Sequence, residues 1–238
     1  MVRNLKLALF AGWMTAVPAW GQNLDNLILL TQPQFRLLSE DLGGAFSYHP
    51  QTPAEPLGFP GFDLGIAVTG AKLNNQAIAE LASSDSVNST ILIPTLRAHV
   101  GLPLRFDVGA MYAWVPDSDI RYYGGELRFA IVKGDSVTPA VGLRGSFTKV
   151  TGVDQLDLET RGLDVSISKG FGPLTPYAGI GKVWVDSTPN VPTLQKEEFD
   201  LDKFFFGLGM NFAGLNINLE GGKTGDVKVY GVKLGLRF

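Results

Sequence analysis

Ten segments between residues 62 and 238 alternate apolar and polar side chains with a period of two, and this pattern constrains the fold more than any other feature. The clearest is the last, in which apolar Tyr230, Val232, Leu234, Leu236 and Phe238 alternate with glycine and basic residues. A period of two is typical of a strand with two different faces. The segments, each about long enough to cross a bilayer when tilted, are residues 62–73, 91–102, 104–115, 122–132, 138–149, 158–169, 174–186, 203–212, 215–220 and 230–238.

The connections between these segments alternate in length. Tight links at 102–104, 133–137, 170–173 and 212–214 alternate with more polar links at 74–90, 117–121, 150–157, 186–199 and 222–227. Outer-membrane barrels have short periplasmic turns, longer outer loops and an even number of strands. The pattern therefore predicts an all-β fold, a transmembrane antiparallel up-and-down barrel of about ten strands over residues 62–238, with both barrel ends of the chain in the periplasm.

Residues 22–61 are predicted to form an N-terminal extension. A helix is expected between Asp25 and Asp41, followed by a Pro-rich segment that leads to Phe62. Leu42–Tyr48 could pass for a strand, but an eleventh strand would have to start from the outer surface, where an exported N-terminus is not expected. The extension is expected to plug the lumen or cap the periplasmic mouth, and the alternative is that it adds two strands to make twelve.

The first residues have the pattern of a secretory signal peptide. Arg3 and Lys6 precede a short apolar run, and Ala19-Trp20-Gly21 offers small residues for cleavage. Cleavage is predicted after Gly21, so that residues 1–21 are removed. The remaining chain has 18 basic and 23 acidic residues, which argues against a nucleic-acid partner. The absence of cysteine excludes disulfides and a lipidated N-terminal cysteine.

The polar faces of the segments carry charges of both signs among many glycines. Such a set suits a lumen in which opposite charges pair, because an unpaired charge in a narrow interior is costly. The predicted lumen-lining residues are Asp63, Arg97, His99, Asp107, Glu126, Arg128, Arg144, Asp164, Lys182, Lys203, Glu220, Lys233 and Arg237. The same set would fit the solvated outside of a soluble barrel, so other features must decide.

Aromatic residues near the segment ends favour a membrane barrel. Tyr112, Trp114 and Trp184 lie by the predicted outer loops, and Phe106 and Phe212 by the turns, as in the aromatic girdles of membrane barrels. The final strand, apolar at alternate positions and ending in Phe238, resembles the C-terminal assembly signal of outer-membrane β-barrel proteins. The resemblance implies location in the outer membrane, with its lipid, the barrel-assembly machinery and periplasmic chaperones as partners. An exported soluble barrel is the alternative.

The sequence nominates no catalytic or metal-binding residues and no cofactor. His99 lies on a polar face, but on a strand that places it toward the periplasmic end, and His49 belongs to the extension. A hydrogen-bonded lumen histidine is therefore a better interpretation of His99 than a catalytic base. Asp117 and Asp119 lack the further ligands and glycine of a calcium loop. We expect a protein that is not an enzyme.

Two classes of function remain, transport and a structural role. Eight-stranded barrels are filled by side chains, whereas sixteen strands leave a channel, so ten strands predict a narrow pore that inward glycines could widen. The chain resembles small uncharacterised outer-membrane barrels and, in arrangement only, the fatty-acid transporters with their N-terminal hatch. The leading hypothesis is a narrow or plugged channel for small solutes or apolar molecules, of unknown cargo. A structural or interaction barrel is the alternative, and a barrel-embedded hydrolase is a third.

Overall fold

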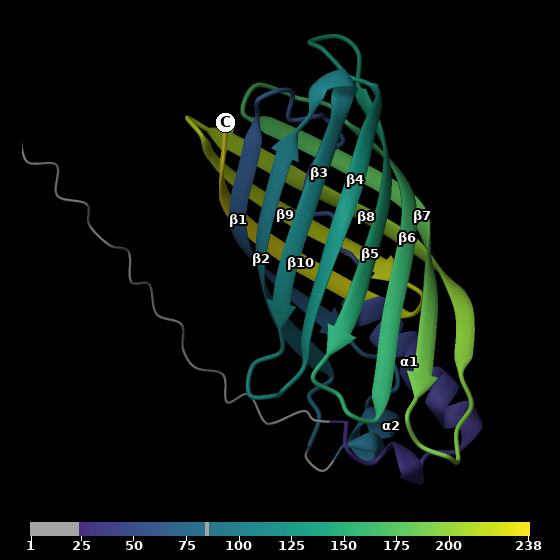
Figure 1. Ribbon diagram of the computed structural model, residues 1–238. Coiled ribbons are helices and arrows are strands. Elements are labelled where there is room, and N and C mark those ends of the chain that lie inside the picture. Colours follow the sequence, from purple (N-terminus) through teal and green to yellow (C-terminus); the bar gives the residue numbers. More distant parts are fainter. Residues whose placement is uncertain (1–23, 84–85) are drawn as a thin grey trace, which may run out of the picture.

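Ten antiparallel strands close into one barrel in the computed structural model, which describes residues 24–83 and 86–238 (Figure 1). The strands are β1 (Phe62–Lys72), β2 (Thr90–Gly101), β3 (Phe106–Trp114), β4 (Arg121–Val132), β5 (Ala140–Thr151), β6 (Leu156–Ser168), β7 (Leu174–Pro189), β8 (Glu197–Phe212), β9 (Leu215–Thr224) and β10 (Val227–Arg237). Each strand pairs with its neighbours in sequence, and β1 pairs with β10 from Asp63↔Arg237 to Lys72↔Lys228. The predicted ten-stranded up-and-down barrel is confirmed, and the described residues form no eleventh or twelfth strand. The predicted signal peptide and its cleavage site after Gly21 lie outside the described residues.

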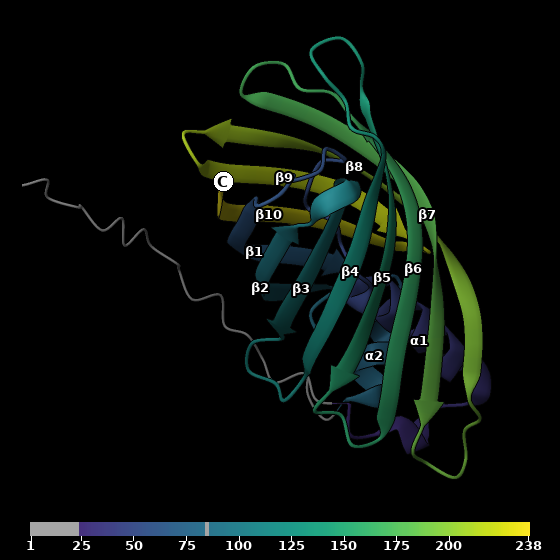
Figure 2. The ribbon, with the colours of Figure 1, turned by 45° about the horizontal axis from the view of Figure 1, so that its top comes forward.

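The two ends of the barrel differ in their connections. We call one the turn end, with connections 102–105, 133–139, 169–173 and 213–214, and the other the long-loop end, with connections 73–89, 115–120, 152–155, 190–196 and 225–226. Phe62 and Phe238 meet at the turn end, where the Phe62 amide donates to the Phe238 carbonyl at 2.8 Å. The first long connection contains α2 (Gln76–Ala82), which the sequence pattern did not predict (Figure 2).

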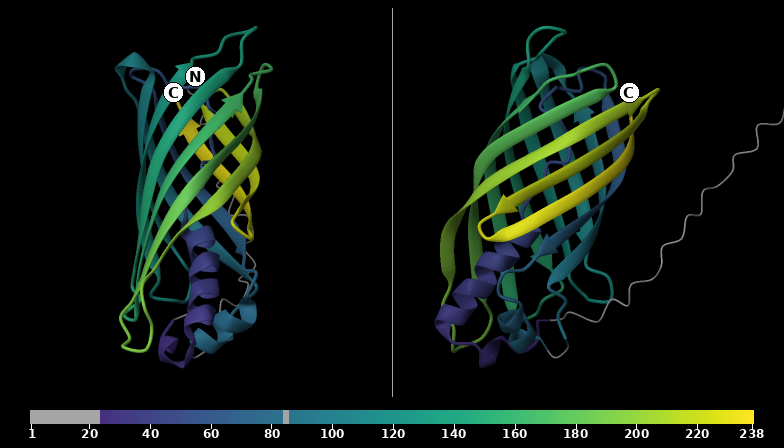
Figure 3. Two further views of the ribbon diagram at one scale, coloured as in Figure 1. Left: turned by 90° about the vertical axis from the view of Figure 1, so that its right-hand side faces the viewer. Right: turned by 180° about the vertical axis from the view of Figure 1, so that it is seen from behind.

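Strands β7 and β8 extend further at the long-loop end than the sequence pattern predicted. Each has 16 residues, and β8 begins at Glu197 in a stretch expected to be loop. The yellow-green hairpin that joins them reaches beyond the rest of the wall, beside α1 (Gln32–Phe46) (Figure 3). The barrel is therefore taller on this side.

The predicted helix of the extension exists, but it begins and ends later than expected. After a 3-10 turn, η1 (Leu27–Leu29), helix α1 starts where the Thr31 backbone and side chain engage the Gln34 side chain in a capping box. It continues through Gly43 and Gly44 to Phe46, although each helical glycine costs about 1 kcal/mol relative to alanine. A Cβ at Gly43 would lie 2.7 Å from Val185, so the missing side chain is what allows α1 to approach the wall. The strand-like segment Leu42–Tyr48 is thus mainly the end of a helix.

The extension occupies the inside of the barrel. Helix α1 sits in the long-loop end, and residues 47–61 cross the lumen to reach β1 at the turn end (Figure 3). The first described residues therefore lie at the long-loop end, whereas the sequence analysis expected the N-terminus on the side of the turns and the extension as a plug of the lumen or a cap of the periplasmic mouth. Helix α1 lies in the long-loop end, whereas a periplasmic cap was expected at the turn end.

The outer face of the wall is apolar over a continuous band. On β8 the outward residues from Phe204 to Phe212 are all apolar, and charged Asp202 follows at the long-loop side. Nine residues of a tilted strand span about 23 Å, close to the ~25 Å band of outer-membrane barrels. Exposed aromatic rings border the band at both ends, with Tyr112 and Trp184 toward the loops and Phe238 at the turns. No helix among the described residues is long and apolar enough to cross a membrane. The fold is that of an outer-membrane β-barrel.

Candidate functional site: the lumen and the segment that fills it

The middle of the lumen holds a chain of buried charges that alternate in sign. Arg144 on β5 lies between Glu126 on β4, at 2.8 Å, and Asp164 on β6, at 3.5 Å. Asp164 also pairs with Lys203 on β8 at 3.2 Å, and Glu126 lies 3.3 Å from the His99 imidazole on β2. This network links strands β2, β4, β5, β6 and β8 across the lumen. The pairing of opposite charges offsets the free-energy cost of removing them from water.

Two further buried pairs lie closer to the turn end. Asp107 on β3 binds Arg128 on β4 at 2.6 Å, and Asp63 on β1 binds Lys233 on β10 at 2.5 Å. The second pair spans the seam at which the barrel closes. Both pairs join neighbouring strands, so they reinforce the sheet from inside.

The structure brings most of the predicted lumen residues together. The following point inward: Asp63, Arg97, His99, Asp107, Glu126, Arg128, Arg144, Asp164, Lys203, Glu220, Lys233 and Arg237. Arg237 lies at the turn-end mouth, where its guanidinium is 3.5 Å from the Glu55 carbonyl.

Lys182 is the exception, because it lies on the outer face. Its ammonium binds Asp200 at 2.5 Å and Asp202 at 3.0 Å, on the adjacent strand. The prediction assumed that the polar residues of β7 face inward along its whole length. At the long-loop end the relation reverses, since Val183 and Val185 face α1 inside and Lys182 faces outward at the edge of the apolar band.

The charged side chains do not line an open pore. They bind the backbone of residues 46–57, which has no strand partner of its own. Cations bind its carbonyl groups: Lys203 donates to Tyr48 O at 2.7 Å, Arg97 to His49 O at 2.7 Å and Arg128 to Pro53 O at 2.8 Å. A buried backbone group needs a hydrogen-bond partner, and the wall supplies it.

Acidic and hydroxyl groups complete this arrangement by binding the amide groups of the same segment. Glu220 accepts from the Gln51 amide at 2.7 Å, Asp107 from the Leu57 amide at 3.1 Å and Ser168 from the Glu55 amide at 3.2 Å. We call residues 47–57 the plug segment. Charge-assisted hydrogen bonds of this kind are about twice as strong as neutral ones, so the wall holds the plug segment by its backbone.

Glycines in the wall make room for the plug segment and for the chain that follows it. A Cβ at Gly101 would lie 2.0 Å from the Gly58 carbonyl oxygen, and one at Gly231 would lie 2.1 Å from the side-chain Nε2 of Gln51. A Cβ at Gly142 would lie 3.6 Å from that of Ala54. The space that the inward glycines suggested for a solute is therefore occupied by the chain itself.

The long-loop half of the lumen is apolar, which the sequence reasoning missed. Phe35, Leu38 and Phe46 of α1 are almost fully buried against inward residues such as Val183 and Tyr122. The Phe46 and Tyr122 rings lie 5.4 Å apart. The available signal was the end of each segment, as in Ile91-Leu92-Ile93, where both faces become apolar.

His99 is enclosed in this packing. Its Nε2 lies 3.3 Å from the Tyr48 hydroxyl and 3.3 Å from Glu126, and 2% of the residue is exposed.

The void beside His49, Lys203 and Glu220 has about 10 Å³, enough for about one water molecule. Among the described residues, no three His, Asp or Glu side chains gather as metal ligands.

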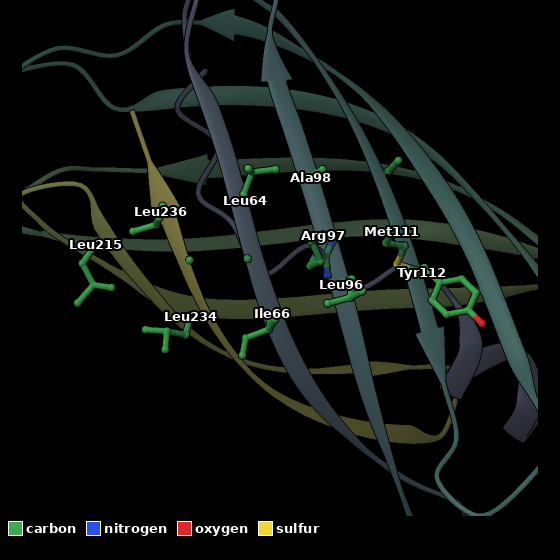
Figure 4. A pocket seen from close by; sticks show the side chains of 13 residues that line it. Leu64, Ile66, Leu96, Arg97, Ala98, Met111, Tyr112, Leu215, Leu234 and Leu236 are labelled. Carbon is green, nitrogen blue, oxygen red and sulfur yellow. The ribbon is translucent and has the colours of Figure 1, made fainter. Parts of the chain in front are cut away.

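A much larger hollow, of about 660 Å³, lies on the outer face (Figure 4). Aliphatic side chains such as Leu64, Leu96 and Leu234 border it, and the paired Ala98 and Ala110 form its shallow floor. Its aliphatic border belongs to the apolar band of the outer face.

Comparisons with known proteins return barrels of this kind. No family model matches the chain, and a search of curated proteins found no match. Among solved structures, the chain is similar to LpxR from Salmonella typhimurium, at 11% identity over 73% of this chain and 100% of that chain, with a TM-score of 0.40. The N-terminal β-barrel domain of Pseudomonas aeruginosa OprF matches at 15% identity over 74% and 97%, with a TM-score of 0.37. KdgM porin matches at 10% identity over 73% and 99%, with a TM-score of 0.37. These similarities concern the barrel fold alone.

Proposed function

We propose that the protein is a self-plugged channel of the outer membrane for small polar solutes. The observation that supports this most is the way in which the plug segment is held: by ionised and hydroxyl side chains that bind its backbone. A barrel with a purely structural role could fill this space with apolar residues, because replacing buried ion pairs by well-packed apolar groups is often neutral or stabilising. A polar wall can be hydrated once the plug segment leaves.

The proposal concerns a channel, not an enzyme. His99 is the wall's only histidine, and Tyr48 and Glu126 enclose it in the closed state. A substrate would reach it only after the plug segment had moved. An enzyme would then lose its activity in His99→Ala, whereas a channel would keep its conductance.

A disulfide between the plug segment and the wall tests the proposal. Ala54→Cys and Gly142→Cys place two thiols at a Cβ separation near 3.6 Å, within the range of a disulfide. The chain has no other cysteine, so the bond is unique. In planar bilayers, we expect intermittent conductance from the reduced double variant and from the wild type, and none from the oxidised double variant. The Ala54→Cys single variant controls for effects of the oxidant.

Deletion of residues 24–61 gives the complementary result. The truncated barrel should conduct continuously, because the polar wall is then open to water. No current from the wild type and none from the folded truncated barrel would refute the channel.

A structural or interaction role is the second candidate. It is favoured by the tall β7–β8 hairpin, on which Trp184 borders the apolar band and the outward residues Asp186 and Glu198 lie beyond it, accessible to a partner. If binding of such a partner is the function, replacement of these side chains would abolish it while the conductance test gives no current in any form.

A further inference from the structure

Three lysines stand side by side on the outer face at the edge of the apolar band. Lys72 on β1 is opposite Lys228 on β10, and Lys228 is opposite Lys223 on β9. All three side chains point outward and are exposed. Like charges directly opposite each other destabilise a sheet, so this lysine row is costly unless an anion shares it.

Two of the three lysines in the row lack the acidic partners that several other outward lysines have. Lys149 binds Glu159 at 2.7 Å, Lys182 binds Asp200 and Lys196 binds Asp186. In the row, Lys223 binds Asp226 at 2.8 Å. Neither Lys72 nor Lys228 has a carboxylate partner in the part of the chain that the structure describes. The net charge of the row with Asp226 is positive.

An apolar groove begins directly beside the row on the membrane side. The next outward residues are Gly70, Tyr230 and Gly221, in register across the same strands. The groove has about 480 Å³, and Phe206, Leu219 and Tyr230 border it around Gly221. The absent side chain at Gly221 deepens the groove, since a Cβ there would already touch the Phe206 ring at 3.3 Å.

We propose that this surface binds a lipid whose headgroup carries exposed phosphate, in the leaflet on the long-loop side. The phosphate lies on Lys72, Lys228 and Lys223, and an acyl chain lies in the groove. Charge complementarity selects the headgroup, because basic residues at a membrane surface attract anionic lipid. The position of the row at the edge of the apolar band places it at the depth of headgroups. The groove requires an attached acyl chain, which a free phosphate ion lacks.

Native mass spectrometry of the refolded full-length protein in detergent tests the proposal, with diphosphoryl lipid A as the probe. The comparison variant is Lys72→Gln/Lys228→Gln. The matched control, Arg105→Gln/Lys133→Gln, removes two exposed charges at the turn end. About fivefold in affinity per basic residue predicts about 25-fold weaker binding for the first variant and no change for the control.

Three further measurements separate the headgroup from the groove. Phosphatidylcholine, whose phosphate is neutralised by choline, should bind much more weakly than the probe. Inorganic phosphate should fail to displace the probe at equal concentration. Gly221→Leu, which fills the groove and leaves the lysines in place, should weaken binding of the probe. Equal binding by the wild type and Lys72→Gln/Lys228→Gln would overturn the proposal, as would equal binding of the probe and phosphatidylcholine.

Discussion

The Asp107–Arg128 pair links two strands to two points of the plug segment, so its removal should have a large and non-additive effect. The carboxylate accepts from Arg128 at 2.6 and 3.0 Å and from the Leu57 amide, while Arg128 also donates to Pro53 O. Both side chains are almost fully buried. In Asp107→Ala, the guanidinium loses its carboxylate, and breaking a buried pair costs about 3 to 5 kcal/mol. Arg128→Met should cost about the same.

The double variant Asp107→Ala/Arg128→Met should lose much less free energy of unfolding than the sum of the losses in the two single variants. It buries no unpaired charge, and its main loss is the hydrogen bonds to the Leu57 amide and the Pro53 carbonyl, at about 1 to 3 kcal/mol each. The double-mutant cycle should therefore give a coupling of about 4 kcal/mol.

Urea unfolding of the refolded protein in detergent, followed by tryptophan fluorescence, measures these free energies. The exposed pair Lys149–Glu159, at 2.7 Å, is the matched control and should give a coupling of less than about 1 kcal/mol. A second readout is the reactivity of a thiol at position 54, which is fully buried in the wild type. It should increase in Asp107→Ala. A coupling near zero in the buried pair, with an unreactive thiol, would refute the view that this pair holds the plug segment.

Three other expectations follow from the arrangement. First, an impermeant thiol reagent on intact cells should label Asp25→Cys but not Val137→Cys, because residue 25 lies at the long-loop end and residue 137 at the turn end; the reverse pattern would invert the orientation. Second, burial raises the pKa of Asp41, although the hydrogen bonds that its carboxylate accepts from the Asn75 and Asn74 backbone amides act in the opposite direction. An acid whose pKa is higher in the folded state loses stability as pH rises from its unfolded pKa, about 3.9, through the folded value. The thermal midpoint should therefore fall over that window in the wild type, and it should fall less in Asp41→Asn. Third, Phe35→Ala, at a fully buried site of α1, should cost about 3 to 5 kcal/mol and expose α1 to protease, while Leu37→Ala on its exposed side should change little.

The sequence by itself determined the barrel. Alternation with a period of two indicates two different faces, and the even number of segments with alternating link lengths predicted a closed barrel of about ten strands, with twelve as the alternative. It also indicated most of the charged lumen, because residues such as Arg144 and Asp164 stand on the side of their strands opposite to the lipid-facing residues. These properties are local, so each strand carries them without its partners.

The tertiary structure alone decided where the extension goes and what the lumen charges do. Alternation cannot show which face is inward where both faces are apolar. The prediction that Lys182 lines the lumen was therefore wrong, and the apolar residues of the wall that contact α1 were not predicted. The extent of α1 depends on Gly43 and Gly44 packing against the wall, a contact between residues far apart in sequence. The sequence of the plug segment has no helical or strand periodicity from which its path could be predicted. Its course follows from the complementarity of Lys203, Arg97 and Glu220 to its carbonyl and amide groups, which exists only once the barrel has closed around it.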